Sequence, residues 1–242
     1  MKAKKEFKRK EHKYIIDSTK YDQFIIDLQK HMSIDKYGLH TIMSLYYDTD
    51  DFLLIRHSME KPAYKEKLRV RSYQTPNNDT TVFLELKKKI QGTVYKRRIE
   101  LPYREYLKLE TTKKLSENIE RTQTYREIDW VYKRYKTLQP RVLISYDRLS
   151  FFTPDDSNFR VTFDHDIRFR THDLSLKNGS YGKLVAPEIG VLMEVKVLGA
   201  YPLWFVDLLN KYHLRKSSFS KYSQTYTRYI HKNNIEVMTH VS

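Results

Sequence analysis

The stretch from Lys65 to Leu101 constrains the fold most, because it reads as three consecutive strands with charges at alternate positions. Successive side chains of a strand point to opposite faces, so each segment has one charged face and one largely apolar face. The apolar positions include Leu68, Leu84 and Ile99. The charged positions are Lys65, Lys67, Arg69 and Arg71, then Glu85, Lys87 and Lys89, and then Lys96, Arg98 and Glu100.

Most of these alternating charges are cationic, which an ordinary solvated sheet face does not explain. A solvated face usually mixes signs, because like charges on neighbouring strands lie ~5 Å apart and destabilise the sheet. Two unit charges at ~4 Å repel by about 1 kcal/mol in water, and by more where water is partly excluded. A polyanionic ligand would relieve this repulsion. The formal charge of +15 agrees and leaves nucleic acid, nucleotide, polyphosphate and an anionic membrane as candidate partners.

The whole chain predicts an α+β fold class. Its 242 residues contain 40% hydrophobic and 31% charged residues and no low-complexity linker, so we expect a single domain over 1–242. Besides the three strands above, strand patterns cover 6–16, 41–48, 141–151, 159–169 and 191–198. Helix patterns cover 19–31, 50–59, 103–137, 202–212 and 220–232. These patterns together predict about eight largely antiparallel strands with flanking helices. If the sheet closes, the charged strand faces would line its lumen.

Composition also bears on localisation. The absence of cysteine excludes disulfides and thiolate chemistry, which fits a reducing cytoplasm. No apolar run approaches the ~20 residues that span a bilayer, so no transmembrane segment is expected. Met1–Lys13 is basic and lacks the apolar region of a secretory signal. We expect a cytoplasmic protein, and a peripheral position at the inner face of a membrane stays open, as does the oligomeric state.

A Glu-x-Lys pair occurs near each end of the chain, as Glu11-His12-Lys13 and Glu194-Val195-Lys196. The second lies in the apolar run Leu192–Leu198, where an unpartnered charge would cost free energy. Glu194 is therefore a candidate metal ligand or catalytic carboxylate, and the alternative is a structural ion pair. Mg²⁺ and Mn²⁺ prefer carboxylate, water and phosphate oxygens. No Gly-rich phosphate loop is present, and zinc is not expected, because no ligand-like spacing links His12, His57, His165 and His213.

Seven short motifs follow one another in a specific order. They are Arg9-Lys10-Glu11-His12-Lys13-Tyr14, Tyr46-Tyr47-Asp48-Thr49, Lys67-Leu68-Arg69-Val70-Arg71, Phe83-Leu84-Glu85-Leu86-Lys87, Lys96-Arg97-Arg98, Glu194-Val195-Lys196 and Phe219-Ser220-Lys221-Tyr222. Together they resemble the catalytic domain of the vacuolar transporter chaperone (VTC) type of polyphosphate polymerase, within the triphosphate tunnel metalloenzymes. The resemblance runs from Arg9 to about Tyr229.

The resemblance implies a closed antiparallel tunnel in which basic side chains hold a triphosphate and a carboxylate holds Mn²⁺ or Mg²⁺. It implies that Glu194 holds the metal. For Glu85, we expect a supporting ion pair with a neighbouring Lys or Arg, and the alternative is orientation of water or a ligand side chain. Two positions depart from the family pattern: Ser218 replaces a common Lys, and Lys89 replaces a common His. By position, the phosphate ligands would be Lys13, Arg69, Arg71, Lys87, Lys96, Arg148 and Arg160. Further substrate-binding residues would be Tyr46, Arg98, Ser220 and Lys221.

In function, the resemblance implies a phosphotransferase that moves the γ-phosphate of ATP onto a growing inorganic polyphosphate and releases ADP. The expected partners are ATP and polyphosphate, and association with a separate membrane protein stays open. The alternatives are an inorganic or nucleoside triphosphatase on the same fold, or a non-catalytic module that binds polyphosphate or RNA. The 20 tyrosines would suit base stacking, but they do not interleave with the basic strand faces. We therefore expect no nucleic-acid partner, and packing against the sheet for aromatics such as Tyr125, Trp130 and Tyr135.

Overall fold

The structure, a computed structural model, describes residues 9–116, 119–154 and 156–231. Its strands are β1 (Arg9–Ile16), β2 (Ser33–Ile34), β3 (His40–Asp48), β4 (Tyr64–Ser72), β5 (Thr81–Ile90), β6 (Thr93–Pro102), β7 (Gln139–Thr153), β8 (Asp156–Arg170), β9 (Lys183–Leu184), β10 (Val191–Leu198) and β11 (Lys216–Ser217). Its helices are α1 (Ser18–Gln29), α2 (Leu53–Met59), α3 (Tyr103–Thr112), α4 (Gln123–Arg134), α5 (Leu203–Lys211) and α6 (Lys221–Thr225), with a 3₁₀ turn η1 (Leu176–Asn178) and a π-helical turn η2 (Tyr226–Ile230). The α+β class is confirmed.

The strands form one sheet in the order β11-β1-β10-β8-β7-β3-β4-β5-β6, with β2 beside β7 and β9 beside β8. All pairings with a described register are antiparallel. Eleven strands replace the predicted eight, and the difference is the three two-residue strands β2, β9 and β11. The order has two ends among the described residues, so closure into a tunnel is not confirmed and stays a prediction.

The chain divides into two compact units. Unit 1 contains Met1–His40, Tyr146–Ile167 and Ala186–Ser220, and unit 2 contains Thr41–Ser145, Arg168–Val185 and Lys221–Ser242. Strands β7 and β8 each contribute residues to both units. Our expectation of a single domain stays a prediction.

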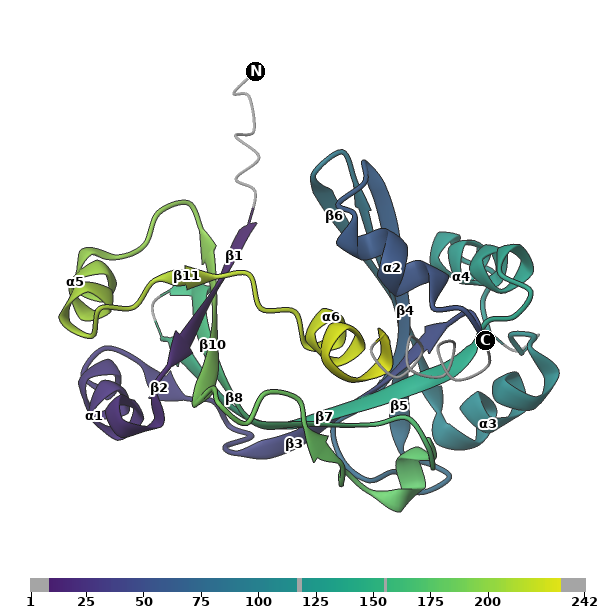
Figure 1. Ribbon diagram of the computed structural model, residues 1–242, viewed down its shortest axis with the longest axis horizontal. Helices are drawn as coiled ribbons and strands as arrows, with labels where there is room; N and C mark the ends of the chain where they lie inside the picture. Colours follow the sequence, from purple (N-terminus) through teal and green to yellow (C-terminus); the bar gives the residue numbers. More distant parts are fainter. Residues whose placement is uncertain (1–8, 117–118, 155, 232–242) are drawn as a thin grey trace, which may run out of the picture. The chain divides into compact units, whose positions relative to one another are not determined.

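In unit 1, α1 and α5 lie side by side against one face of the strands (Figure 1). Asp17 caps α1, because its side chain accepts a hydrogen bond from the backbone N–H of Thr19. Phe24 from α1 and Phe205 from α5 are fully buried against strand residues such as Val195. The helices thus cover the apolar strand face, and the charged positions of β1, β8 and β10 lie on the other face.

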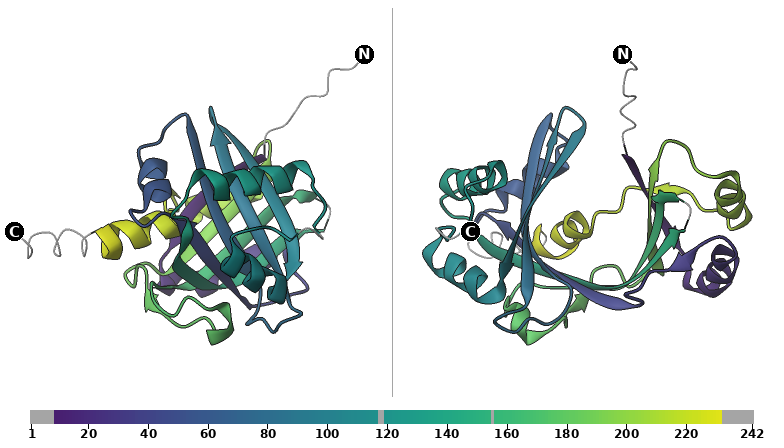
Figure 2. Two further views of the ribbon diagram at one scale, coloured as in Figure 1. Left: turned by 90° about the vertical axis from the view of Figure 1, so that its right-hand side faces the viewer. Right: turned by 180° about the vertical axis from the view of Figure 1, so that it is seen from behind.

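In unit 2, β4, β5 and β6 form two successive hairpins, with α3 and α4 across their apolar face (Figure 2). Gln91 and Gly92 make the tight turn between β5 and β6, and both have positive φ, which Gly adopts without strain. Leu68, Leu84 and Ile99 are buried beneath the helices, as their alternation predicts. The opposite face of these strands carries the alternating charges.

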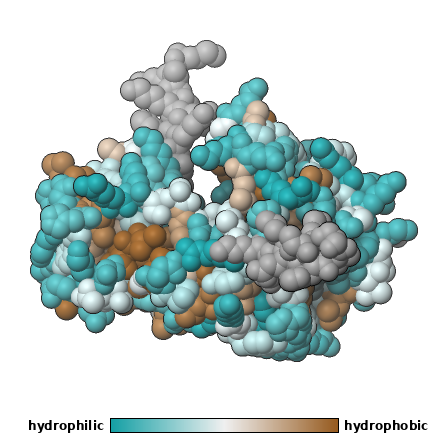
Figure 3. Space-filling view, in the orientation of Figure 1, coloured by the Kyte–Doolittle hydropathy of each residue, from teal (hydrophilic) through white to brown (hydrophobic). Residues whose placement is uncertain are grey.

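The remaining differences from prediction are local. Residues 171–187, for which the sequence patterns predicted neither helix nor strand, contain η1 and β9, and the last helix changes from α-helical to π-helical turns after Thr225. Two-residue strands carry too short a pattern for any sequence period to mark them. No described helix is long and apolar enough to cross a membrane. Most of the basic segment Met1–Lys13 lies outside the described residues. The face drawn in Figure 3 is mostly hydrophilic, with apolar residues in separate patches.

Candidate functional site

Unit 1 holds a buried ion-pair network, the Glu194 cluster, which consists of Lys13, Arg148, Asp164 and Glu194. Lys13 lies directly opposite Glu194 in the β1–β10 register, and its Nζ is 3.4 Å from Glu194 Oε1. Arg148 donates from its guanidinium to Glu194 Oε2 at 3.1 Å. Lys13 on β1 and Arg148 on β7 therefore converge on one β10 carboxylate that is only 8% exposed.

Arg148 is fixed by a second carboxylate that sequence reasoning did not single out. Its Nε and a terminal nitrogen donate to the two oxygens of Asp164 at 2.5 and 2.7 Å, a bidentate geometry. Burial alone would lower the pKa of Arg148, but Asp164 and Glu194 outweigh burial and raise its pKa well above the usual value. The charge of Arg148 is thus permanent. The sequence signal was present, since Asp164 shares the charged face of β8 with Arg160.

Arg160 does not join the Glu194 cluster in the structure. Its guanidinium donates to Asp35 at 2.8 Å, and its side chain is 43% exposed. In the register it lies opposite Lys196, and the next pair on the same face of these two strands is Thr162 and Glu194. Arg160 therefore shares the face of Glu194, and its role as a phosphate ligand stays a prediction.

Glu194 fits as the single protein carboxylate of a divalent-cation site. Among the described residues, no group of three or more His, Asp or Glu side chains gathers in a way that could hold a metal alone. A hard cation bound through one carboxylate keeps its other positions for water and phosphate oxygens. The donor set of unit 1 therefore fits Mn²⁺ or Mg²⁺ if phosphate oxygens complete the coordination.

Unit 2 holds a second network, the Glu85 cluster, in which four cations surround one carboxylate. Glu85 is 2% exposed and lies between the β4 and β6 residues Arg69 and Arg98 in the register. Arg69 donates from two nitrogens to Glu85 Oε2 at 2.9 and 2.7 Å. Lys96 Nζ and Arg98 Nε lie 2.9 and 3.4 Å from Oε1, and Arg71 Nε lies 3.9 Å from Oε2. This confirms the predicted supporting ion pair of Glu85.

The cations of this cluster control the ionisation of Glu85. Burial would raise the pKa of this carboxyl, but the charges of Arg69, Arg71 and Lys96 outweigh burial and lower its pKa to about 2. One carboxylate still cannot neutralise four cations. The cluster keeps a net positive charge around a rigid centre, which suits a binding site for anionic oxygens.

Next to the Glu85 cluster, three lysines lie directly opposite one another on adjacent strands. Lys67 on β4 pairs with Lys87 on β5, and Lys87 pairs with Lys96 on β6. No carboxylate forms an ion pair with Lys87 among the described residues. Directly opposed like charges destabilise a sheet. This lysine row therefore costs stability in the free protein, and a bound polyanion would remove the cost.

Replacing Lys87 by Ala is expected to raise the free energy of unfolding of the free protein by about 0.5–1 kcal/mol, because one member of the lysine row is removed. Inorganic triphosphate should then stabilise the variant less than the wild type. Urea denaturation with and without triphosphate measures both effects. Lys133→Ala is the control, because Lys133 pairs with Asp129 on an exposed side of α4. Lower stability of free Lys87→Ala would contradict the repulsion.

Tyr46 lies among the cations of unit 2 and binds Arg69, whose guanidinium donates to the Tyr46 hydroxyl at 3.0 Å. Burial would raise the pKa of Tyr46, but Arg69, Arg71 and Lys67 outweigh burial and lower it to about 8. The ring stacks on Tyr222 with 4.7 Å between centroids. Tyr46, a predicted substrate-binding residue, thus lies among the basic side chains of unit 2, and its binding role stays a prediction.

The motif Phe219-Ser220-Lys221-Tyr222 is anchored at several points. In unit 1, Lys13 Nζ donates to the carbonyl of Phe219 at 3.0 Å. In unit 2, Tyr222 donates to Asp48 at 2.9 Å, and Asp48 also accepts from the backbone N–H groups of Leu54 and Ile55 at the start of α2. Lys221 is 8% exposed at the first position of α6. The structure thus orders this motif, while the binding roles of Ser220 and Lys221 stay predictions.

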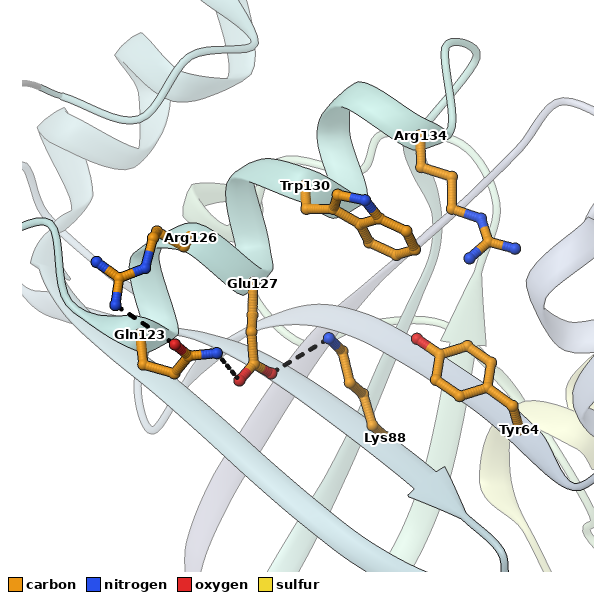
Figure 4. Close-up of a pocket in the computed structure, with 7 residues that line it drawn as sticks. All are labelled: Tyr64, Lys88, Gln123, Arg126, Glu127, Trp130 and Arg134. Atoms are coloured by element: carbon orange, nitrogen blue, oxygen red, sulfur yellow. Dashed lines mark hydrogen bonds and ion pairs between the residues drawn. The ribbon is translucent and has the colours of Figure 1, made fainter.

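A separate pocket of about 530 Å³ lies between α4 and the strands of unit 2 (Figure 4). Lys88 reaches this pocket and bridges to Glu127 at 3.2 Å, and Glu127 also pairs with Arg97. Trp130 is 44% exposed there, with Arg134 over its ring at 4.8 Å. The expected packing against the sheet is therefore wrong for Trp130, whereas Tyr125 and Tyr135 do pack against the core.

Comparison with known families identifies the chain. The family model for the VTC domain matches residues 8–230. The chain belongs to the VTC domain family. This confirms the resemblance given by the ordered motifs. A comparison with curated proteins found no match.

Two solved structures are similar in fold to this VTC domain. One is a protein from Bacillus halodurans described provisionally as an adenylate cyclase, with a TM-score of 0.56, 14% identity and coverage of 91% of this chain and 96% of that chain. The other is an adenylyl cyclase candidate from Hippeastrum for which a dominant triphosphatase activity is stated, with a TM-score of 0.51, 14% identity and coverage of 90% and 94%. At this identity the likeness shows the fold.

Proposed function

We propose that this VTC domain is a metal-dependent polyphosphate polymerase, which transfers the γ-phosphate of ATP onto the end of an inorganic polyphosphate chain. The observation that carries the proposal is the lysine row, Lys67, Lys87 and Lys96, beside the Glu85 cluster. A strand face that repels itself in the free protein is explained by a ligand with several adjacent negative charges. A closed tunnel with a charged lumen belongs to the proposal.

The reaction needs little covalent chemistry from the protein. An oxygen of the terminal phosphate of the chain forms a bond to the γ-phosphorus of ATP, and the bond from that phosphorus to the β–γ bridging oxygen breaks. The chain grows by one phosphate and ADP leaves. Catalysis then consists of in-line positioning and neutralisation of charge on the non-bridging oxygens. The transfer requires no nucleophilic side chain, because the terminal phosphate of the chain is itself the nucleophile.

The residues of unit 2 would supply the positioning. The Arg69 guanidinium is held by Glu85 and by its bond to the Tyr46 hydroxyl. A fixed guanidinium fork aligns phosphate oxygens, whereas the lysines act as point charges. Because Glu85 stays ionised, the cluster is preorganised before substrate binds.

The residues of unit 1 would supply the cation site. Glu194 would hold Mn²⁺ or Mg²⁺, which when bound neutralises charge on phosphate oxygens. Lys13 contacts one oxygen of Glu194 and Arg148 contacts the other, so the carboxylate is held in place between two cations. Arg160, Ser220 and Lys221 are proposed as further phosphate contacts on the strength of the family resemblance.

A triphosphatase is the second candidate, and the stated activity of the Hippeastrum neighbour favours it. In that reaction water replaces the end of the phosphate chain as the nucleophile. The same cationic clusters would serve both reactions, so the products must decide between them.

Incubation of the purified protein with ATP and Mn²⁺ or Mg²⁺ is expected to yield ADP and long-chain phosphate, with one ADP released for each phosphate added to the chain. Gel electrophoresis and ³¹P spectroscopy resolve the products, and a short polyphosphate primer should shorten any lag. Orthophosphate without chains would establish the triphosphatase instead. Tight polyphosphate binding without turnover of ATP or triphosphate would show a binding module.

A further inference from the structure

Two aromatic side chains lie at one end of the charged face of unit 2, where the alternation of charges predicts polar residues. Phe83 on β5 lies opposite Arg71 on β4, and Tyr73 follows the last residue of β4. Their rings pack edge to face with 5.4 Å between centroids. The residues that β5 gives to the buried core, such as Val82 and Leu84, point to the other face. Tyr73 is 39% exposed, so core packing does not explain this pair.

Arg98 joins the two rings to the Glu85 cluster. Its guanidinium carbon lies 3.8 Å from the centre of the Phe83 ring, a close cation–π contact. A terminal nitrogen donates to the Tyr73 hydroxyl at 3.2 Å, and Nε is 3.4 Å from Glu85 Oε1. Arg98 is thus held on three sides. We call Tyr73, Phe83 and Arg98 the aromatic shelf.

The shelf continues into the phosphate-binding residues in a fixed order. The first row across the strands contains Arg71 and Phe83, the second contains Arg69 and Glu85, and the third is the lysine row. Rows on one face are two residues apart, so with ~3.3 Å per residue the lysine row lies about 13 Å from the first row. A ligand with a flat ring at one end and a chain of negative charges after it would match this order of aromatic and then cationic side chains.

We propose that the aromatic shelf binds the base of a nucleoside triphosphate, whose phosphates extend past Arg69 toward the lysine row. Bases stack on aromatic rings and on guanidinium planes. Stacking accepts any base, so the shelf would favour nucleotides over inorganic triphosphate without a strong choice among bases. The inference rests on the proposed function for the phosphates and adds the base site and the direction of the nucleotide.

The test compares the binding of ATP and inorganic triphosphate by calorimetry in the presence of Mn²⁺, with both ligands supplied as non-hydrolysable imido analogues to prevent turnover. Tyr73→Leu is expected to weaken ATP binding by about tenfold and to leave triphosphate binding within about twofold, because only ATP has a base to stack. Tyr73→Phe keeps the ring and should keep ATP binding. Tyr95→Leu is the matched control, since Tyr95 is 41% exposed and lies next to Lys96 on the opposite strand face.

The outcomes separate this inference from the proposed function. If the wild type binds both ligands and Tyr73→Leu changes neither, or changes both equally, the base site is wrong and the phosphate site stands. If Tyr73→Phe fails as strongly as Tyr73→Leu, the hydroxyl and not the ring matters, which also overturns stacking. If the wild type binds neither ATP nor triphosphate, the proposed function fails and the base site fails with it.

Discussion

Glu194→Gln is expected to reduce ATP-dependent synthesis of phosphate chains by at least about 100-fold, because Glu194 is the proposed carboxylate ligand of the divalent cation and Gln carries no charge. A 100-fold loss corresponds to about 2.7 kcal/mol of transition-state stabilisation, within the several kcal/mol that a metal ion supplies to charged phosphoryl oxygens. The fold should persist, since Arg148 keeps its bidentate pair with Asp164. The rate is measured from ADP release at saturating ATP over a range of Mn²⁺ concentrations.

Two controls make the Glu194 result specific. Glu11→Gln removes a carboxylate of the same strand face that lies 4.0 Å from Lys196, and its activity should stay near that of the wild type. Mn²⁺ binding in the presence of triphosphate, followed by electron paramagnetic resonance, should weaken only in Glu194→Gln. Unchanged Mn²⁺ binding in that variant would show that Glu194 is only a structural ion-pair partner.

Glu85→Gln is expected to lower the free energy of unfolding by about 3–5 kcal/mol, the largest stability effect that we predict. The substitution removes the buried carboxylate around which Arg69, Arg71, Lys96 and Arg98 gather, and it leaves four cations to repel one another. Breaking a buried ion pair by removing one partner has a cost of this size. For a chain of this length the loss lowers the melting temperature by roughly 6–20 °C.

The effect of Glu85 should depend on pH in a defined direction. Its pKa is lowered from 4.5 to about 2 in the folded protein, so the folded state favours the ionised form. The stabilisation is therefore fully present above pH 4.5 and is lost as pH falls from there toward 2. A shift of this size corresponds to about 3 kcal/mol. Denaturation of wild type and Glu85→Gln at several pH values should show the two curves converging in acid.

Glu100→Gln is the matched control, because Glu100 lies on the same strand face but is 62% exposed. Its ion pair with Arg98 is long, at 3.9 Å. The free energy of unfolding of the Glu100→Gln variant should differ from that of the wild type by less than about 0.5 kcal/mol. Triphosphate should restore part of the stability lost in Glu85→Gln, since phosphate oxygens can replace the missing carboxylate among the cations. A stability difference that persists unchanged at pH 2 would contradict the electrostatic origin.

The parts of the fold predicted from the sequence are those with a clear period. Alternation of charged and apolar residues in 65–101 predicted three strands, and the structure places all three with the apolar face under α3 and α4. The same alternation predicted that Arg69, Arg71 and Glu85 share a face. It also predicted Glu194 on a charged strand face, because a carboxylate in an apolar run needs partners.

Contacts between residues distant in sequence were not predicted, because they depend on register and strand order. Asp164 became the partner of Arg148 through the pairing of the successive strands β7 and β8, and a charge pattern cannot show which carboxylate a given arginine reaches. Trp130 is an aromatic on an amphipathic helix, and its exposure beside Lys88 follows from where α4 crosses the strands. Neither the composition nor the local sequence pattern distinguishes Asp164 or Trp130 from other residues of the same type.

The sequence by itself therefore determined the α+β class, the charged strand faces, the family and the identity of the cationic residues, because each depends on local period or on ordered motifs. Only the tertiary structure decided how those charges are balanced. Register placed one carboxylate among four cations in unit 2 and set Lys67, Lys87 and Lys96 directly opposite one another on adjacent strands. It also brought Tyr73 and Phe83 together at one end of the same strand face. Coulomb energy and stacking depend on distances across strands, which chain order does not specify.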